Sequence, residues 1–179
     1  MRDVLHGRFF LFANANDFAM TAALDVGLER GIPAERYTLM SDDREFGRFI
    51  RAQSDSYETA LREIRGGAKR SHWMWYVFPQ IAGLGQSAMA QRFAIADRAE
   101  AEAYLAHPVL GDRLREITQA LQALSDPDPE RVFGGTDAMK LRSSLTLFAS
   151  VDKDAGGLFQ QALERWFGGE QDEATIERL

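Results

Sequence analysis

Apolar residues after residue 45 recur at spacings of three, four and seven, which is typical of amphipathic helices. The first stripe begins at Phe46 and runs to Ile64, and residues 54–56 (SDS) are suited to break or bend it. Gly66 and Gly67 follow the last periodic residue. We expect the helix to end there, because glycine adopts the left-handed conformation that closes many helices.

Later helices are predicted from stripes, caps and breakers. They comprise a helix capped by Ser87, a helix from the Asp97/Glu100 capping box to about 106, a stripe over 109–124 that ends before Pro127, a helix from Thr136 through Phe148, a helix over 158–167 and a short piece from Asp172. Together they predict a mainly α fold, a single compact domain over residues 40–179 with about seven or eight short helices.

The aromatic run before Pro79 is too short for its periodicity to distinguish strand from helix. Residues 72–78 are therefore the one candidate for a short extended segment in this domain.

The first 39 residues differ from the rest. Asp17 is suited to cap a helix to about Arg30, and Met40 precedes a second helix start with Asp42 and Glu45 as a capping pattern. We interpret residues 1–39 as an N-terminal extension, either mobile or added by a start site upstream of the native one. Met40 is then the alternative start.

No targeting or membrane segment is expected. The apolar run at 9–13 is shorter than the roughly 7–15 residues of a secretory core, and no stretch approaches the roughly 18 apolar residues of a membrane span. The chain is therefore predicted to be cytoplasmic, without a membrane partner.

Composition narrows the chemistry further. The formal net charge of -6 over 179 residues disfavours nucleic acid as a partner, although Arg62, Arg65, Lys69 and Arg70 form a local basic stretch. The absence of Cys excludes disulfides, thiol nucleophiles and Cys-ligated metal sites. The three His lack the spacing of a zinc site, so we assign no metal and no cofactor.

The first candidate site lies in residues 69–80 (KRSHWMWYVFPQ). Lys69 could neutralise phosphate, Trp73 or Trp75 could stack on a base or sugar, and the run ends at Gln80. His72 could act as a general acid or base near neutrality. The same residues would serve equally as core aromatics with a solvated basic edge.

The second candidate lies on the helix from Thr136. Lys140, Ser143 and Ser144 share one helical face, with Asp137 three residues before the lysine. This cluster could bind an anion, or Lys140 could activate a serine as a nucleophile. The structural alternative is that both hydroxyls bond to the preceding helical turn.

At these segments the sequence resembles the bacterial domain of unknown function 1810 family. The matching stretches are 69–80, 83–87, 94–96, 104–111 and 137–148, within coverage from about Glu45 to Leu179. Phe93 stands where the family usually has Tyr. The resemblance implies a mainly helical cytosolic protein. It also implies that Lys69, His72, Gln80, Lys140, Ser143 and Ser144 occupy polar motif positions, which favours a shared pocket.

The leading functional hypothesis is binding of a phosphorylated or nucleotide-like small molecule in a basic and aromatic pocket. Its alternatives are a structural or protein-interaction module, and a hydrolase or transferase acting on an ADP-ribose-like compound with His72 as acid or base. Nucleic-acid binding ranks last. The sequence leaves open whether the protein is an enzyme and what its oligomeric state is.

Overall fold

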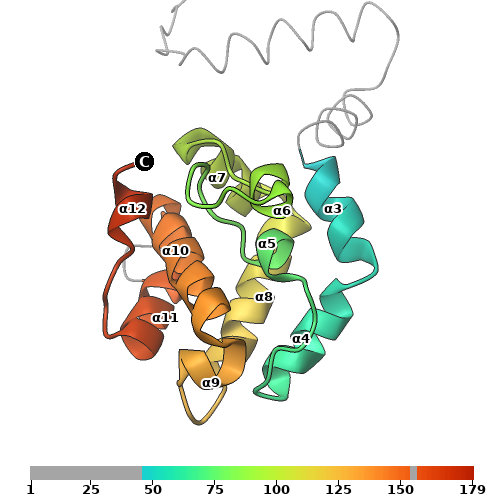
Figure 1. The fold of residues 1–179 in the computed structure, drawn as a ribbon, viewed down its shortest axis with the longest axis vertical. Coiled ribbons are helices and arrows are strands. Elements are labelled where there is room, and N and C mark those ends of the chain that lie inside the picture. Colours follow the sequence, from blue (N-terminus) through green and yellow to red (C-terminus); the bar gives the residue numbers. More distant parts are fainter. Residues whose placement is uncertain (1–45, 154–156) are drawn as a thin grey trace, which may run out of the picture. The chain divides into compact units, whose positions relative to one another are not determined.

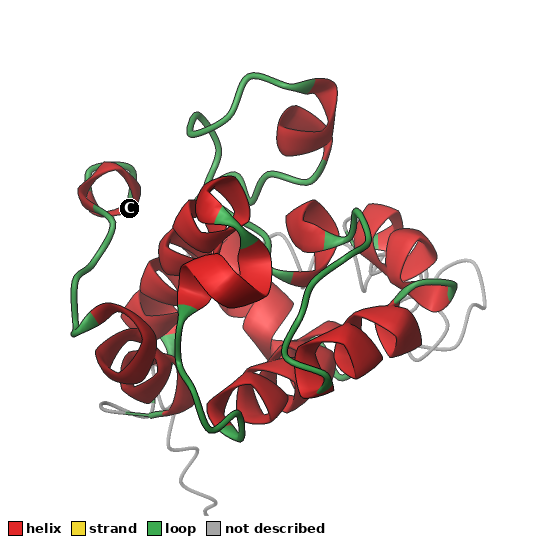
Figure 2. Cartoon of the chain, turned by 60° about the horizontal axis from the view of Figure 1, so that its bottom comes forward, coloured by secondary structure: helices red, strands yellow, loops and turns green. Residues whose placement is uncertain are grey.

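The structure, a computed structural model, describes residues 46–153 and 157–179. The helices within these ranges are α3 (Gly47–Ser54), α4 (Tyr57–Arg65), α5 (Met74–Val77), α6 (Ala88–Arg92), α7 (Arg98–Ala106), α8 (Leu110–Gln122), α9 (Pro129–Phe133), α10 (Gly135–Val151), α11 (Leu158–Phe167) and α12 (Glu173–Ile176) (Figure 1). Figure 2 shows that helices joined by loops make up the described chain. The predicted mainly α, compact multi-helix fold is confirmed. The helices of the described ranges number ten rather than seven or eight, because the first stripe divides into α3 and α4, and because α5 and α9 are too short to show a periodic stripe.

The helix α10 occupies the centre of the packing. It contacts α5, α7, α9, α11 and α12, and in Figure 1 it lies between α5 and the pair α11 and α12. Every residue from Ser143 to Phe148 is buried, so this part of the helix is covered on all sides. Positions on α10 therefore have fixed neighbours in several other helices.

Aromatic rings connect the helices through the core. The ring of Tyr104 on α7 lies 5.1 Å from that of Phe49 on α3 and 5.5 Å from that of Phe148 on α10. Phe148 in turn lies 5.8 Å from Phe159 on α11. Each buried aromatic removes roughly 150–250 Å² from water, so rings of this kind supply a large part of the stability of a small domain.

The predicted break at residues 54–56 and the predicted caps Ser87 and Asp97 are confirmed. The first stripe divides into α3 and α4 at residues 55–56. Ser87 Oγ accepts a hydrogen bond from the Ala90 amide at 3.1 Å, and Asp97 Oδ1 accepts one from the Glu100 amide at 2.9 Å. These side chains satisfy amide groups that have no partner within their own helix.

The aromatic run forms a helix rather than a strand. Residues 74–77 form the single turn α5, in which the Trp73 carbonyl accepts a hydrogen bond from the Val77 amide at 3.1 Å. The turn stops ahead of Pro79, which has no amide hydrogen to continue it. The extended alternative for residues 72–78 is thus not realised at 74–77, and the one isolated bridge in the described chain pairs Ile81 with Ile95.

Two sequence predictions lie outside the described residues. One is the helix from Asp17 to about Arg30 in the N-terminal extension over 1–39. The other is the capping pattern of Asp42 and Glu45.

Candidate functional site

Glu63 organises the loop that leads from α4 to α5. Its Oε2 atom accepts hydrogen bonds from the Arg70 amide at 2.8 Å, the Ser71 amide at 3.0 Å and the Trp73 indole nitrogen at 2.8 Å. Its Oε1 atom accepts the Ser71 hydroxyl. Burial alone would raise the pKa of Glu63, but the donors from Ser71, Arg70 and Trp73 outweigh it and lower the pKa to about 2. The carboxylate is therefore charged at neutral pH and fixes the loop backbone.

This loop places Lys69 in a nearly buried position. The side chain is only 8% exposed, and its ammonium forms an ion pair with Asp137 Oδ2 at 2.6 Å. The ammonium also donates to the Ser71 carbonyl at 2.7 Å and lies 5.0 Å from the Trp73 ring centroid. Lys69 is thus held by groups of the protein itself.

Asp137 joins the two segments that the sequence singled out. Its Oδ1 atom accepts from Lys140 Nζ at 2.6 Å, while Oδ2 pairs with Lys69. Burial acts to raise the pKa of Asp137, but the hydrogen bonds from Lys140 and Lys69 prevail and hold it below the usual range. We call Lys69, Asp137 and Lys140 the lysine–aspartate cluster. With two cations and one anion it carries a net charge of about +1 at neutral pH.

Lys140 connects this cluster to Trp75. Its ammonium lies 4.5 Å from the centroid of the Trp75 ring, within the range of a cation–π interaction. Its side chain is 21% exposed, so it is more accessible than Lys69. Lys140 is therefore the cation of the cluster that a ligand could reach more readily.

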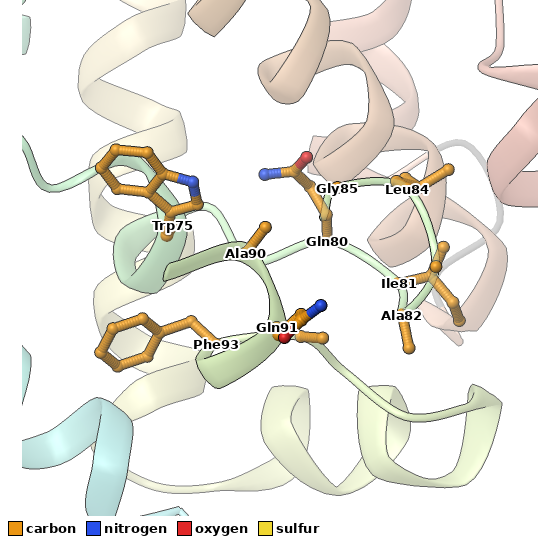
Figure 3. A pocket seen from close by; sticks show the side chains of 11 residues that line it. Trp75, Gln80, Ile81, Ala82, Leu84, Gly85, Ala90, Gln91 and Phe93 are labelled. Carbon is orange, nitrogen blue, oxygen red and sulfur yellow. The ribbon is translucent and has the colours of Figure 1, made fainter. Parts of the chain in front are cut away.

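A pocket of about 230 Å³ lies beside Trp75. Trp75, Gln80, Gln91 and Phe93 line it together with residues 81–85, Ala90 and Ala94 (Figure 3). Figure 3 shows the indole nitrogen of Trp75 on the side that faces Gln80. Two residues predicted for the site, Trp75 and Gln80, thus line one pocket, and a third, Lys140, packs on the ring of the first.

The other predicted residues do not line this pocket. Trp73 is fully buried, so its ring has no face open to a ligand. His72 is exposed, and its side chain has no hydrogen-bond partner among the described residues. Ser143 Oγ donates to the Met139 carbonyl at 3.1 Å, while Ser144 Oγ is buried and has no partner within the described part of the chain. No hydrogen bond or ion pair among the described residues joins His72 to either serine, and the roles of all three stay predictions.

Sequence reasoning missed Glu63 and Gln91. Glu63 is the single acidic residue among the basic residues of 62–72. That isolated charge is the signal that could have indicated its role in the loop. Gln91 gave no signal, because its place in the pocket depends on where the short helix α6 packs.

The described ranges contain no group of three or more His, Asp or Glu side chains placed to hold a metal ion. In the same ranges, no helix has the length and apolar character needed to cross a bilayer.

Fold and site together define a small all-α domain in which an ion-paired lysine packs on a tryptophan at the edge of a pocket. The chain belongs to the family described as protein of unknown function (DUF1810), whose sequence model matches residues 43–179. It is also similar to the crystal structure of the conserved hypothetical protein Rv1873 from Mycobacterium tuberculosis. That similarity has 41% sequence identity and a TM-score of 0.73, and covers 75% of this chain and 96% of the other. No curated protein matches the sequence.

Proposed function

We propose that this domain binds a phosphorylated or nucleotide-like small molecule at the pocket beside Trp75. The proposal is carried by one relationship: Lys140 lies 4.5 Å from the ring of Trp75, which lines the pocket together with Gln80. An aromatic ring and a carboxamide that line one concavity, with a cation packed on that ring, are elements that small-molecule sites combine.

The contacts divide the predicted residues into two groups. Trp75, Gln80 and Lys140 would contact the ligand, since they line the pocket or pack on its edge. Lys69 would support them through Asp137, because it is only 8% exposed and already paired. Lys140 would therefore supply the charge that attracts a phosphate.

The size of the pocket limits the ligand. Small-molecule sites usually enclose roughly 300–1,000 Å³, and this pocket has about 230 Å³. It is therefore suited to enclose one part of a nucleotide, such as its base or its sugar phosphate, while the remainder extends over the surface.

A structural or protein-interaction module is the second candidate. The polar groups of Lys69 and Ser143 form hydrogen bonds within the protein, as expected if their role is structural. A domain of this kind would have no affinity for nucleotides.

The third candidate, a hydrolase or transferase acting on an ADP-ribose-like compound, depends on His72. Its imidazole is exposed and free of hydrogen bonds to the described residues, so a substrate could reach it. Conversion of ADP-ribose by the protein, abolished in His72→Ala, would favour this candidate over simple binding.

The decisive experiment is a thermal-shift screen with nucleoside monophosphates, ADP-ribose and sugar phosphates. A ligand at 100 times its Kd stabilises the native state by about 2.7 kcal/mol, which is a clear shift for a domain of this size. Lys140→Met should reduce the shift that phosphorylated compounds cause. Lys153→Met is the matched control, because Lys153 is an exposed lysine beyond the opposite end of α10. No shift with any compound would contradict the proposal and favour the interaction module.

A further inference from the structure

Among the described residues, the lining of the pocket carries no formal charge. These lining residues include no Lys, Arg, His, Asp or Glu. Cations lie beside lining residues without belonging to the lining itself: Lys140 packs on the ring of Trp75, Arg92 lies over the ring of Phe93, and Arg178 lies beside Gly83. A phosphate inside the pocket would therefore lose its hydration without gaining the charge-assisted hydrogen bonds that usually compensate for it.

The pocket contains neutral polar groups that have no hydrogen-bond partner among the described residues. The indole N–H of Trp75 and the carboxamides of Gln80 and Gln91 form no hydrogen bond with any described residue. An indole N–H only donates, whereas each carboxamide presents a donor beside an acceptor. Such a set matches a ligand that also has both donors and acceptors.

The remaining lining is apolar. Ile81, Leu84 and Phe93 supply side chains without polar atoms, and Ile81 and Phe93 are buried. Apolar walls suit the flat faces of a heteroaromatic ring, while a sugar would bring several hydroxyl groups that these walls leave unsatisfied.

We propose that this pocket recognises a neutral nitrogen heterocycle of the nucleobase type, through Gln80, Gln91 and the indole N–H of Trp75. The phosphate of the ligand stays outside the pocket, on the side of Lys140. A carboxamide pairs in bidentate fashion with a base edge that carries a donor beside an acceptor, as glutamine does with adenine. This inference rests on the proposed function and specifies which part of the ligand determines specificity.

Binding is tested by titration calorimetry with the full chain and four kinds of probe. These are the common nucleosides, their 5′-monophosphates, ribose 5-phosphate and inorganic phosphate. At least one nucleoside should bind within about tenfold of its monophosphate, because the base supplies most of the contacts. Ribose 5-phosphate and inorganic phosphate should bind far more weakly.

Three variants assign the contacts. Gln80→Ala should weaken the nucleoside and its monophosphate alike, by roughly tenfold, because both lose the same hydrogen bonds. Lys140→Met should weaken the monophosphate and leave the nucleoside unchanged. Gln119→Ala is the matched control, since Gln119 is an exposed glutamine on α8 and lies outside the pocket lining. The unfolding midpoint of each variant shows whether it is folded.

Two results would overturn the inference, and they differ in whether the proposed function also fails. If monophosphates and ribose 5-phosphate bind while no nucleoside does, recognition lies in the phosphate; the inference fails and the proposed function stands. If no probe binds, the proposed function fails, and the inference fails with it.

Discussion

The ammonium of Lys140 lies 4.5 Å from the centroid of the Trp75 ring. This contact ties the lysine–aspartate cluster to the pocket, because Trp75 is also a lining residue. Trp75 is only partly buried, whereas Trp73 is 0% exposed and Trp166 is 4% exposed.

Trp75 should therefore account for the quenchable tryptophan fluorescence of the protein. Acrylamide should quench one accessible component in the native protein, and Trp75→Phe should abolish it because the other two indoles are shielded from the solvent. Stern–Volmer titration measures the effect. Trp166→Phe is the control and should leave the accessible component in place. If the accessible component persisted in Trp75→Phe, it would contradict the burial described for Trp73 and Trp166.

Asp137→Asn should destabilise the domain. It leaves Lys69, a side chain only 8% exposed, without its carboxylate partner, and breaking a buried ion pair typically costs about 3 kcal/mol or more. Urea unfolding measures the free energy. In a Lys69→Met background the same change should cost clearly less, since the uncompensated charge is then absent. Equal costs in both backgrounds would show that the pair contributes nothing.

Glu63 should make stability depend on acid pH. Its pKa lies at about 2 in the folded protein against 4.5 in the reference state, so the folded form binds its proton less readily. The stabilisation is then complete above the unfolded pKa and is lost as the pH falls from about 5 toward 2. Free energies of unfolding across this range should fall less steeply for Glu63→Gln. An identical slope in this variant would rule out the assignment.

Gly111→Ala should be strongly destabilising. A Cβ atom at this position would lie 2.1 Å from the Leu105 carbonyl oxygen, which belongs to the backbone of α7 and cannot move by a side-chain rotation. We expect a loss of roughly 2–4 kcal/mol or failure to fold, as for other overpacked sites. Gly135→Ala is the control, because no atom lies within 4 Å of its added Cβ. That variant should be neutral or gain up to about 1 kcal/mol, as alanine favours the helix. The midpoints of thermal unfolding compare the two.

A fragment of residues 40–179 should fold independently. The family model begins at residue 43, and the described core begins at Phe46. Its melting temperature should lie within a few degrees of the full chain, since it retains every residue of that core. Circular dichroism and thermal unfolding test this. A fragment that is unfolded, or melts far below the full chain, would overturn the interpretation of residues 1–39 as an extension.

Local signals in the sequence predicted most of the helices. The caps Ser87 and Asp97 act within three residues of their own position, so the local sequence contains both partners. The division between α3 and α4 followed from polar residues at 54–56 in the same way. The sequence could not distinguish strand from helix for residues 72–78, because a single turn such as α5 leaves no periodic pattern.

The residue types of the candidate site were also visible in the sequence, but their partners were not. The sequence by itself identified Lys69, Trp75 and Lys140 as candidates and placed Asp137 near Lys140 on one helical face. Only the tertiary structure decided that Asp137 also binds Lys69, 68 residues away along the chain, and that Lys140 packs on Trp75. Helical periodicity determines contacts within one or two turns, whereas contacts between helices depend on how all the apolar faces pack at once.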